Sequence, residues 1–222
     1  MKKNLILLAV IYSCGVSGAL ATDYSLVTDW VFDGSNNPNG AWSYGSMIET
    51  SPGVFDPFVL ATVHDTTSYP DWDRWVVPGT SDTCVVWNIA SGLWSFPANS
   101  VLLNAWGNYS SVVHWEGNAG TYSLSANFQT GGYVTPTSTY PDTTVYVIKN
   151  GTTVLFEQEI FGFSSANIAQ QVSIASGDYL DFVVAGSQEA RAALDANLIA
   201  VPEPTVLSLL GLGGLALTLR RR

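Results

Sequence analysis

The chain has 222 residues, of which 18 are acidic and 8 are basic, so its formal net charge is −10 at pH 7. Five of the basic residues lie at the two ends, as Lys2, Lys3 and Arg220 to Arg222. Residues 22–201 hold 17 acidic and 3 basic residues, a formal charge of −14. A surface of this sign repels phosphate backbones and anionic lipid headgroups, which excludes nucleic acid as a partner of the central region.

The N-terminus has the three parts of a secretory signal peptide. Lys2 and Lys3 precede the apolar stretch Leu5–Ile11, and small residues end at Ala19 and Ala21. A positive n-region, a short h-region and a small-x-small site predict export and cleavage by signal peptidase. We therefore expect residues 1–21 to form a signal helix that is removed after Ala21.

The two cysteines bear on processing and on stability. Ser13-Cys14 leaves a lipoprotein signal open as an alternative, although bulky Tyr12 fits that pattern poorly. Removal of residues 1–21 leaves Cys84 as the one cysteine of the mature chain, so no intramolecular disulfide is expected. Cys84 lies in a β-rich run and is interpreted as a small buried hydrophobe.

Short strands separated by turn residues are expected along the whole central region. In its first half, Gly-, Pro-, Asn- and Asp-rich loops such as 35–40 separate the expected strands, which are Ser25–Phe32, Trp42–Met47, Phe58–Val63, Thr83–Ile89 and Val101–Trp106. A helical turn is expected only at Gln188–Ala193. In the second half, period-2 alternation or flanking turn residues indicate further strands, at 113–115, 122–128, 145–149, 152–160, 168–174, 179–184 and 194–201.

Asn150-Gly151 is the strongest hairpin signal in the chain. About ten short strands with turns between them predict an all-β fold, a two-sheet antiparallel β-sandwich of jelly-roll type. We expect this domain to span residues 22–200, between an N-terminal signal helix and a short C-terminal apolar helix.

The order of several local motifs resembles exported β-sandwich domains of planctomycete-type and related bacteria. These motifs are the run from Asn37 to Gly45, then Gly120-Thr121-Tyr122, Asn150-Gly151 and Ser176-Gly177-Asp178. The pattern is similar to carbohydrate-binding-module-like sandwiches. The resemblance implies a shared fold and raises a carbohydrate ligand as an expectation.

Aromatic residues supply the leading ligand-site hypothesis. Tyr69, Trp72, Arg74 and Trp75 lie within seven positions, together with two acids. Aromatic faces pack beneath the C–H surfaces of sugars, and carboxylate or guanidinium groups bond to hydroxyls. The alternative is that Trp72 or Trp75 folds back into the sandwich while Arg74 pairs with an acid.

An enzyme is the rival interpretation. Glu157 and Glu159 are expected on one face of a strand, roughly 7 Å apart, which overlaps the spacing of carboxylate-pair glycosidases. His64-Asp65 lacks an accompanying nucleophile motif, and His114 is interpreted as a packing or strand-surface residue. We therefore expect no catalytic residues, with a jelly-roll glycoside hydrolase using Glu157 and Glu159 as the alternative.

Calcium is more plausible than zinc, because carboxylates are abundant and no paired Cys or His motif occurs. Asp71 with Asp73, or Asp178 with Asp181, is the candidate pair. Neither pair has the spacing of a dedicated calcium loop, so unpaired turn carboxylates are the preferred interpretation. No other cofactor is expected.

The C-terminus consists of Pro202-Glu203-Pro204, an apolar run from Val206 to Leu219, and Arg220-Arg221-Arg222. Fourteen helical residues span about 21 Å, less than the roughly 30 Å hydrocarbon core. A segment this short is suited to temporary insertion, and the arginines favour a cytoplasmic C-terminus. Residues 201–222 resemble the PEP-CTERM sorting signal of Gram-negative bacteria, which implies cleavage near Pro-Glu-Pro by a membrane-embedded exosortase.

These patterns together predict an exported, non-catalytic protein. The expected route is transient anchoring in the inner membrane, followed by delivery to the cell envelope, outer surface or extracellular matrix. Signal peptidase and an exosortase are the expected processing partners. Extracellular polysaccharide is the expected ligand of the mature domain.

Overall fold

The computed structural model describes residues 22–30, 36–65, 74–79, 85–89, 96–97, 100–131, 143–186 and 190–202. The expected signal segment, most of the C-terminal tail and Cys84 lie outside these residues. Within the described part of the chain, no helix is long and apolar enough to cross a membrane.

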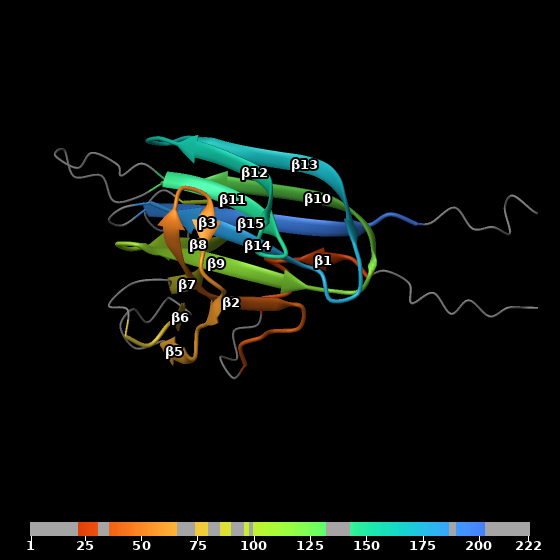
Figure 1. Cartoon of the computed structure of the whole chain (residues 1–222), viewed down its shortest axis with the longest axis horizontal. Coiled ribbons are helices and arrows are strands. Elements are labelled where there is room, and N and C mark those ends of the chain that lie inside the picture. Colours follow the sequence, from red (N-terminus) through yellow and green to blue (C-terminus); the bar gives the residue numbers. More distant parts are fainter. Residues whose placement is uncertain are drawn as a thin grey trace, which may run out of the picture.

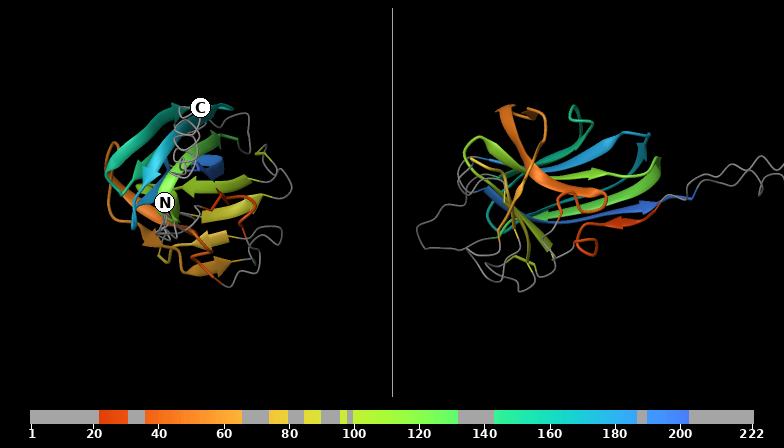
Figure 2. Two further views of the ribbon diagram at one scale, coloured as in Figure 1. Left: turned by 90° about the vertical axis from the view of Figure 1, so that its right-hand side faces the viewer. Right: turned by 90° about the horizontal axis from the view of Figure 1, so that it is seen from below.

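The described strands form two antiparallel sheets that face each other as layers (Figures 1 and 2). The first sheet contains β1 (Tyr24–Ser25), β5 (Val63–Asp65), β6 (Arg74–Val76), β7 (Val85–Ile89), β8 (Ser100–Ala105), β10 (Gly120–Gln129), β13 (Ser165–Ile174) and β15 (Ala190–Ala200). The second contains β2 (Trp42–Ser51), β3 (Val54–Phe55), β4 (Val59–Leu60), β9 (Tyr109–Glu116), β11 (Thr143–Lys149), β12 (Thr153–Ile160) and β14 (Tyr179–Ala185).

The strand order confirms the predicted sandwich. The first sheet runs β13-β10-β15-β8-β7-β6-β5, with β1 beside β15. The second runs β12-β11-β14-β9-β2-β3, with β4 beside β2. From β8 to β15 the chain alternates between the sheets except at the β11–β12 hairpin, which is the jelly-roll-like connectivity expected from the sequence.

The core lies between the sheets and follows from period-2 patterning. In β10, Tyr122, Leu124 and Phe128 point inward and are fully buried, while Ser123 and Ser125 are exposed. Trp115 of β9 packs edge-on against Tyr122, with ring centroids 5.4 Å apart. Because each large apolar side chain contributes about 1.5–3 kcal/mol when it is buried, this alternation fixes which face of each strand turns inward.

The predicted Asn150-Gly151 hairpin is confirmed. Asn150 has φ 53° and Gly151 has φ 67°, which are the left-handed values that a two-residue hairpin turn requires. The Asn150 side chain also reaches across to β14, since its Oδ1 accepts from the Tyr179 amide at 3.0 Å. The turn therefore joins β11 to β12 and also anchors the start of β14.

Three expected elements were wrong in detail. Of the strand expected at Ser25–Phe32, the described residues 25–30 contain only the end of β1, because the carboxylate of Asp29 accepts from the Ser25 amide at 3.0 Å and closes a turn there. The strand expected at Phe58–Val63 is divided into β4 and β5, which belong to different sheets. The helical turn expected at Gln188–Ala193 is strand from Ala190 onward, because those residues pair with β8.

Both ends of the domain lie together. Tyr24 of β1 pairs with Leu198 of β15, and the amide of Val201 donates to the carbonyl of Thr121 at 2.8 Å. Figure 1 shows β1 and the end of β15 at the same end of the sandwich. The C-terminal tail therefore leaves the domain beside its N-terminal strand.

Candidate functional site

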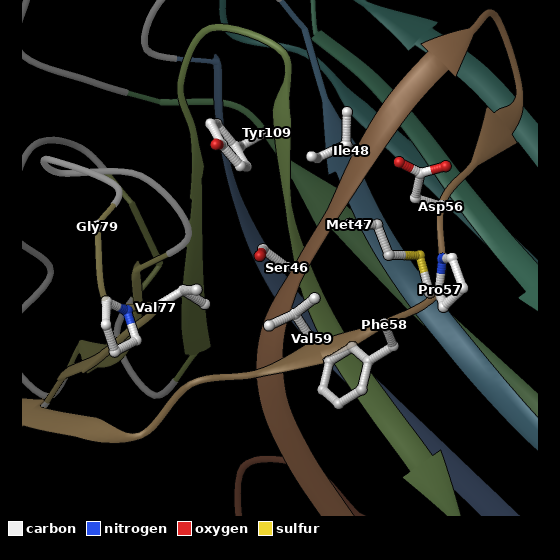
Figure 3. A pocket seen from close by; sticks show the side chains of 11 residues that line it. Ser46, Met47, Ile48, Asp56, Pro57, Phe58, Val59, Val77, Gly79 and Tyr109 are labelled. Atoms are coloured by element: carbon white, nitrogen blue, oxygen red, sulfur yellow. The ribbon is translucent and has the colours of Figure 1, made fainter.

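An open cleft of about 390 Å³ lies beside β2, between the segment that leads into β4 and the end of β6 (Figure 3). Its walls are mainly apolar, with Ile48, Phe58 and Val77 among the lining residues. Asp56 contributes a carboxylate and Tyr109 a phenolic ring. The cleft therefore combines apolar surface with a few polar groups, which is the usual character of a ligand site.

A close approach of two backbone segments builds one wall of this cleft. At Gly45 of β2, an added Cβ would lie 2.1 Å from the carbonyl oxygen of Val59 and 2.7 Å from the Phe58 ring. The Ala61 amide donates to the Tyr44 carbonyl, and the Asp56 amide to that of Ile48, both at 2.9 Å. Glycine at position 45 is therefore required for β4 and Phe58 to lie flat on β2.

The turn between β8 and β9 forms the opposite wall. Trp106 and Tyr109 exchange two backbone hydrogen bonds of 3.1 Å, and Gly107 between them has φ 66°. The Asn108 carbonyl accepts from the Glu49 amide at 3.1 Å, which ties the turn to β2. Tyr109 is half-buried in the cleft, while Trp106 is 38% exposed at the same turn. Two aromatic rings thus flank the turn on a fixed backbone.

A second polar cluster lies on the outer face of the second sheet. His114 Nδ1 is 2.7 Å from Asp181 Oδ1, on neighbouring strands β9 and β14. The His114 ring stacks on Phe58 and also contacts Tyr179, with both centroid distances 4.8 Å. Asp181 is fully buried, and its Oδ2 has no hydrogen-bond partner among the described residues.

Burial governs the electrostatics of that cluster. Desolvation raises the pKa of Asp181, and the hydrogen bond and charge of His114 act in the opposite direction. The pKa of Tyr179 is raised by desolvation and then by the nearby Asp181 carboxylate. His114 is therefore the group that stabilises the ionised form of Asp181, a pairing that extends its expected packing role.

The predicted aromatic ligand site is only partly described. Tyr69 and Trp72 lie outside the described residues. Trp75 is 7% exposed and packs in the core, with its ring centroid 5.0 Å from that of His64. Arg74 pairs with Asp65 on the neighbouring strand β5. These placements match the alternative stated from the sequence, and the buried Trp75 ring is not available for stacking on a sugar.

Glu157 and Glu159 lie where the sequence placed them. Both are exposed on β12, two residues apart and therefore on one face. Their cross-strand neighbours on β11 are Tyr146 and Thr144. Burial and the charges of Glu49 and Glu157 raise the pKa of Tyr146 to about 12. Neither glutamate is among the described residues that line the cleft.

The two described members of the calcium prediction have separate partners. Asp178 pairs with Lys149 at 2.7 Å and accepts from the Ala175 amide at 2.8 Å, and these bonds lower its pKa to about 2. Asp181 pairs with His114 through its Oδ1 atom. Asp71 and Asp73 lie outside the described residues. In the part of the chain that is described, no cluster of three or more potential metal-ligating side chains occurs.

Sequence reasoning missed Trp106 with Tyr109, and His114 with Asp181. The Trp-Gly-Asn-Tyr run was a usable turn signal, because glycine and asparagine between two aromatic residues favour a tight turn that displays both rings. No local signal joins His114 to Asp181, which are 67 residues apart. Their contact depends on strand register alone.

Of the residues predicted to direct processing, only Pro202 is described, and it is exposed two residues after the end of β15. The signal-cleavage residues Ala19 and Ala21 lie outside the described part. So do Glu203, Pro204, Arg220, Arg221 and Arg222 of the tail. Their roles stay predictions from the sequence.

Solved structures resemble this chain only distantly. The K2 adhesin domain of Lys-gingipain matches at 13% identity and a TM-score of 0.38, covering 82% of this chain and 99% of that domain. CBM35 from Paenibacillus barcinonensis matches at 16% identity and a TM-score of 0.29, covering 82% and 100%. With TM-scores this low, these likenesses identify neither a ligand nor an activity.

An arabinose-bound GH51 α-L-arabinofuranosidase matches at 14% identity and a TM-score of 0.35, covering 70% of this chain. The match covers 26% of that enzyme, so the present chain spans about a quarter of its length. No curated protein sequence matches the chain significantly.

The C-terminal tail gives a specific match. Residues 200–222 match the PEP-CTERM protein-sorting motif, which begins at the last residue of β15. This confirms the family resemblance of Pro202-Glu203-Pro204, the apolar run and the terminal arginines. The chain is therefore an exported protein that carries a PEP-CTERM sorting motif, is processed by an exosortase, and is anchored in the membrane transiently before it reaches the cell surface.

Proposed function

We propose that the β-sandwich domain binds extracellular polysaccharide and uses the cleft beside β2 to do so. The observation that carries this proposal is the pair of aromatic rings at the β8–β9 turn, where Trp106 is exposed and Tyr109 lines the cleft. Asp56 stands across the same cleft (Figure 3). The proposed site differs from the aromatic cluster predicted from the sequence, because neither Arg74 nor Trp75 is among the residues that line the cleft.

The chemistry of the cleft suits a polyhydroxylated ligand. Sugar rings present C–H faces that pack on Tyr and Trp rings, and their hydroxyls donate to carboxylates. The apolar residues Ile48, Phe58 and Val77 exclude water beneath such a ring. The backbone bonds that hold Trp106 and Tyr109 fix the platform before binding, which reduces the entropy lost on association.

The charge of the domain selects among polysaccharides. Residues 22–201 carry 17 acidic and 3 basic residues, so a polyanionic chain is repelled at long range. A neutral polysaccharide has no such barrier, and a polyanionic one requires a bridging cation. We expect neutral chains to bind more tightly than anionic ones in buffer without divalent ions.

Affinity electrophoresis of the full chain in detergent tests the site, with xylan, laminarin and galactomannan as neutral probes and alginate as the anionic probe. Trp106→Ala and Tyr109→Ala should each weaken retention on the bound probe about tenfold, because each removes one stacking surface. Phe161→Ala and Phe163→Ala are matched controls, since these exposed phenylalanines lie on the β12–β13 turn outside the cleft. Retention that is unchanged in the Trp106 and Tyr109 variants, or equally weakened in the controls, rejects this site.

A further inference from the structure

β13 is a long edge strand of the first sheet. It pairs with β10 over all ten residues, from Gly120 opposite Ile174 to Gln129 opposite Ser165, without a register shift. The strand runs along the top of the sandwich in Figure 1 and has β10 as its one strand partner among the described residues. A strand paired in unbroken register over this length is a template for another strand.

Along most of β13, the outward backbone groups have no partner among the described residues. Lys149 Nζ donates to the Ser173 carbonyl at 2.7 Å on the side away from β10, so Ser173 faces outward. Because outward and inward residues alternate in an antiparallel ladder, Ser165, Asn167, Ala169 and Gln171 also face outward. Within the described part of the chain, no hydrogen bond reaches the outward amide or carbonyl groups of these four residues.

The other edges of the two sheets carry the usual protection against pairing. β12 has a register shift between Val147 and Ile148 of its neighbour β11, and displays Glu157 and Glu159. β5 has three residues and β3 has two. β13 contains no proline, glycine or charged residue, and its ladder has no bulge. Such unprotected edges are rare unless they are used.

The distribution of charge on the domain favours a second copy of this chain as the partner of β13. Copies of this domain repel one another over most of their surface, because residues 22–201 hold 17 acidic and 3 basic side chains. β13 is uncharged, and so are the exposed β10 residues beside it, Ser123 and Ser125. An uncharged edge without a second strand partner in the described part of the chain is therefore the surface on which a second copy meets the least repulsion.

We propose that two copies of this chain pair antiparallel through β13, with the twofold axis at Ile168. Asn167 then lies opposite Ala169 of the partner subunit, and Ser165 lies opposite Gln171 of the partner subunit. Four such residue pairs exchange about eight backbone hydrogen bonds and join the first sheets into one continuous sheet. This register uses the outward backbone groups of the four residues named above and leaves Ser173 with Lys149.

The pairing also places the two C-terminal tails. Val201 bonds to Thr121, and Gly120 lies opposite Ile174, so the tail leaves at the Ile174 end of β13. An antiparallel pair therefore sends its tails from opposite ends, about 40 Å apart at 3.4 Å per residue. Pairing of this kind suits copies released from the membrane better than two copies inserted side by side.

Disulfide trapping tests the register directly. The full chain, purified in detergent with Cys14 and Cys84 replaced by serine, carries either Asn167→Cys or Ala169→Cys. Oxidation of the mixture should give a covalent dimer of the two variants in severalfold excess over either variant alone, because the two positions face each other about 5.5 Å apart between Cα atoms. Absence of the mixed dimer, or equal yields from the single variants, overturns the proposal.

A charge substitution provides a second, independent measurement by analytical ultracentrifugation in detergent. Ala169→Lys places two like charges on diagonal positions of the proposed pair and should weaken self-association about tenfold or more. Ser125→Lys is the matched control, because Ser125 lies opposite Ala169 on β10, on the same exposed face but one strand from the edge. Equal effects of both variants, no self-association of the parent chain, or open-ended filaments instead of dimers contradict the proposal. Circular dichroism verifies that each variant keeps the sheet.

Discussion

The buried pair of His114 and Asp181 gives the sharpest stability prediction, through the substitution His114→Ala. Asp181 is fully buried, and its one hydrogen bond among the described residues joins its Oδ1 to His114 Nδ1 at 2.7 Å. Removal of the imidazole leaves a carboxylate in the apolar outer face of the second sheet without a partner. The folded state must then hold an unpaired charge or keep the acid protonated.

The magnitude follows from what is removed. Breaking a buried ion pair by deleting one partner costs about 3–5 kcal/mol. The lost ring contacts with Phe58 and Tyr179 add about 0.5–1.5 kcal/mol each. Because the His114 side chain is 14% exposed and water can partly replace it, we expect a total loss of about 3–5 kcal/mol at neutral pH. The double variant His114→Ala with Asp181→Asn should lose only about 1–3 kcal/mol, because no unpaired charge remains.

The pH dependence separates charge from packing. Burial raises the pKa of Asp181, so the folded state favours the protonated carboxyl. The stability that this preference adds is fully present below the ordinary Asp pKa near 3.8. That effect is lost as the pH rises through the raised pKa. His114→Ala removes the hydrogen bond and the charge that lower the pKa of Asp181. The loss of unfolding free energy in this variant should therefore grow from about pH 4 to neutral pH.

Urea unfolding followed by tryptophan fluorescence measures these differences at each pH. An equal cost of His114→Ala at about pH 4 and at neutral pH would contradict the role assigned to the Asp181 charge. A double variant no more stable at neutral pH than His114→Ala alone would contradict it equally.

Two further predictions concern the turn at Asp178 and the processing of the chain. Lys149 is the largest influence that lowers the pKa of Asp178 to about 2, so the stabilising effect of Asp178 is complete above its ordinary pKa of 3.8 and is lost as the pH falls toward 2. Because Lys149 also donates to the Ser173 carbonyl, Lys149→Met should lower the thermal unfolding temperature more at neutral pH than near pH 2, and a pH-independent loss contradicts this cause. Intact mass of the native protein by cellular fraction should show a mature chain from Thr22 to near Val201, whereas retention of Leu207–Arg222 in the surface fraction contradicts tail removal.

The all-β class was predictable because period-2 patterning and turn chemistry are local. Tyr122, Leu124 and Phe128 alternate with polar residues, and Asn150-Gly151 adopts the left-handed values that its composition favours. One failure was also local in origin, whereas the division of Phe58–Val63 and the strand at Ala190 depend on pairing with distant strands. Leu26 and Trp30 have strand-forming side chains and are both buried, but Asp29 competes for the Ser25 amide and closes a turn.

The candidate site was harder to predict from the sequence than the fold. Trp75 was plausible as an exposed ring because a Pro- and Asp-rich loop precedes it, yet its strand turns the ring into the core beside His64. The cleft depends on Gly45, because only glycine allows β4 and Phe58 to approach β2 so closely. A glycine in a strand indicates a close approach of some kind, but the sequence does not say which segment approaches.

The sequence by itself determined where this protein goes. A sorting signal is read as a linear segment by membrane-embedded machinery, so charge, apolar length and the Pro-Glu-Pro motif are sufficient to recognise it. Only the tertiary structure decided which side chains meet, because contacts between strands depend on sheet order and register over long separations. The pairing of His114 with Asp181, the burial of Trp75 and the edge position of β13 among the described strands all follow from that order and register.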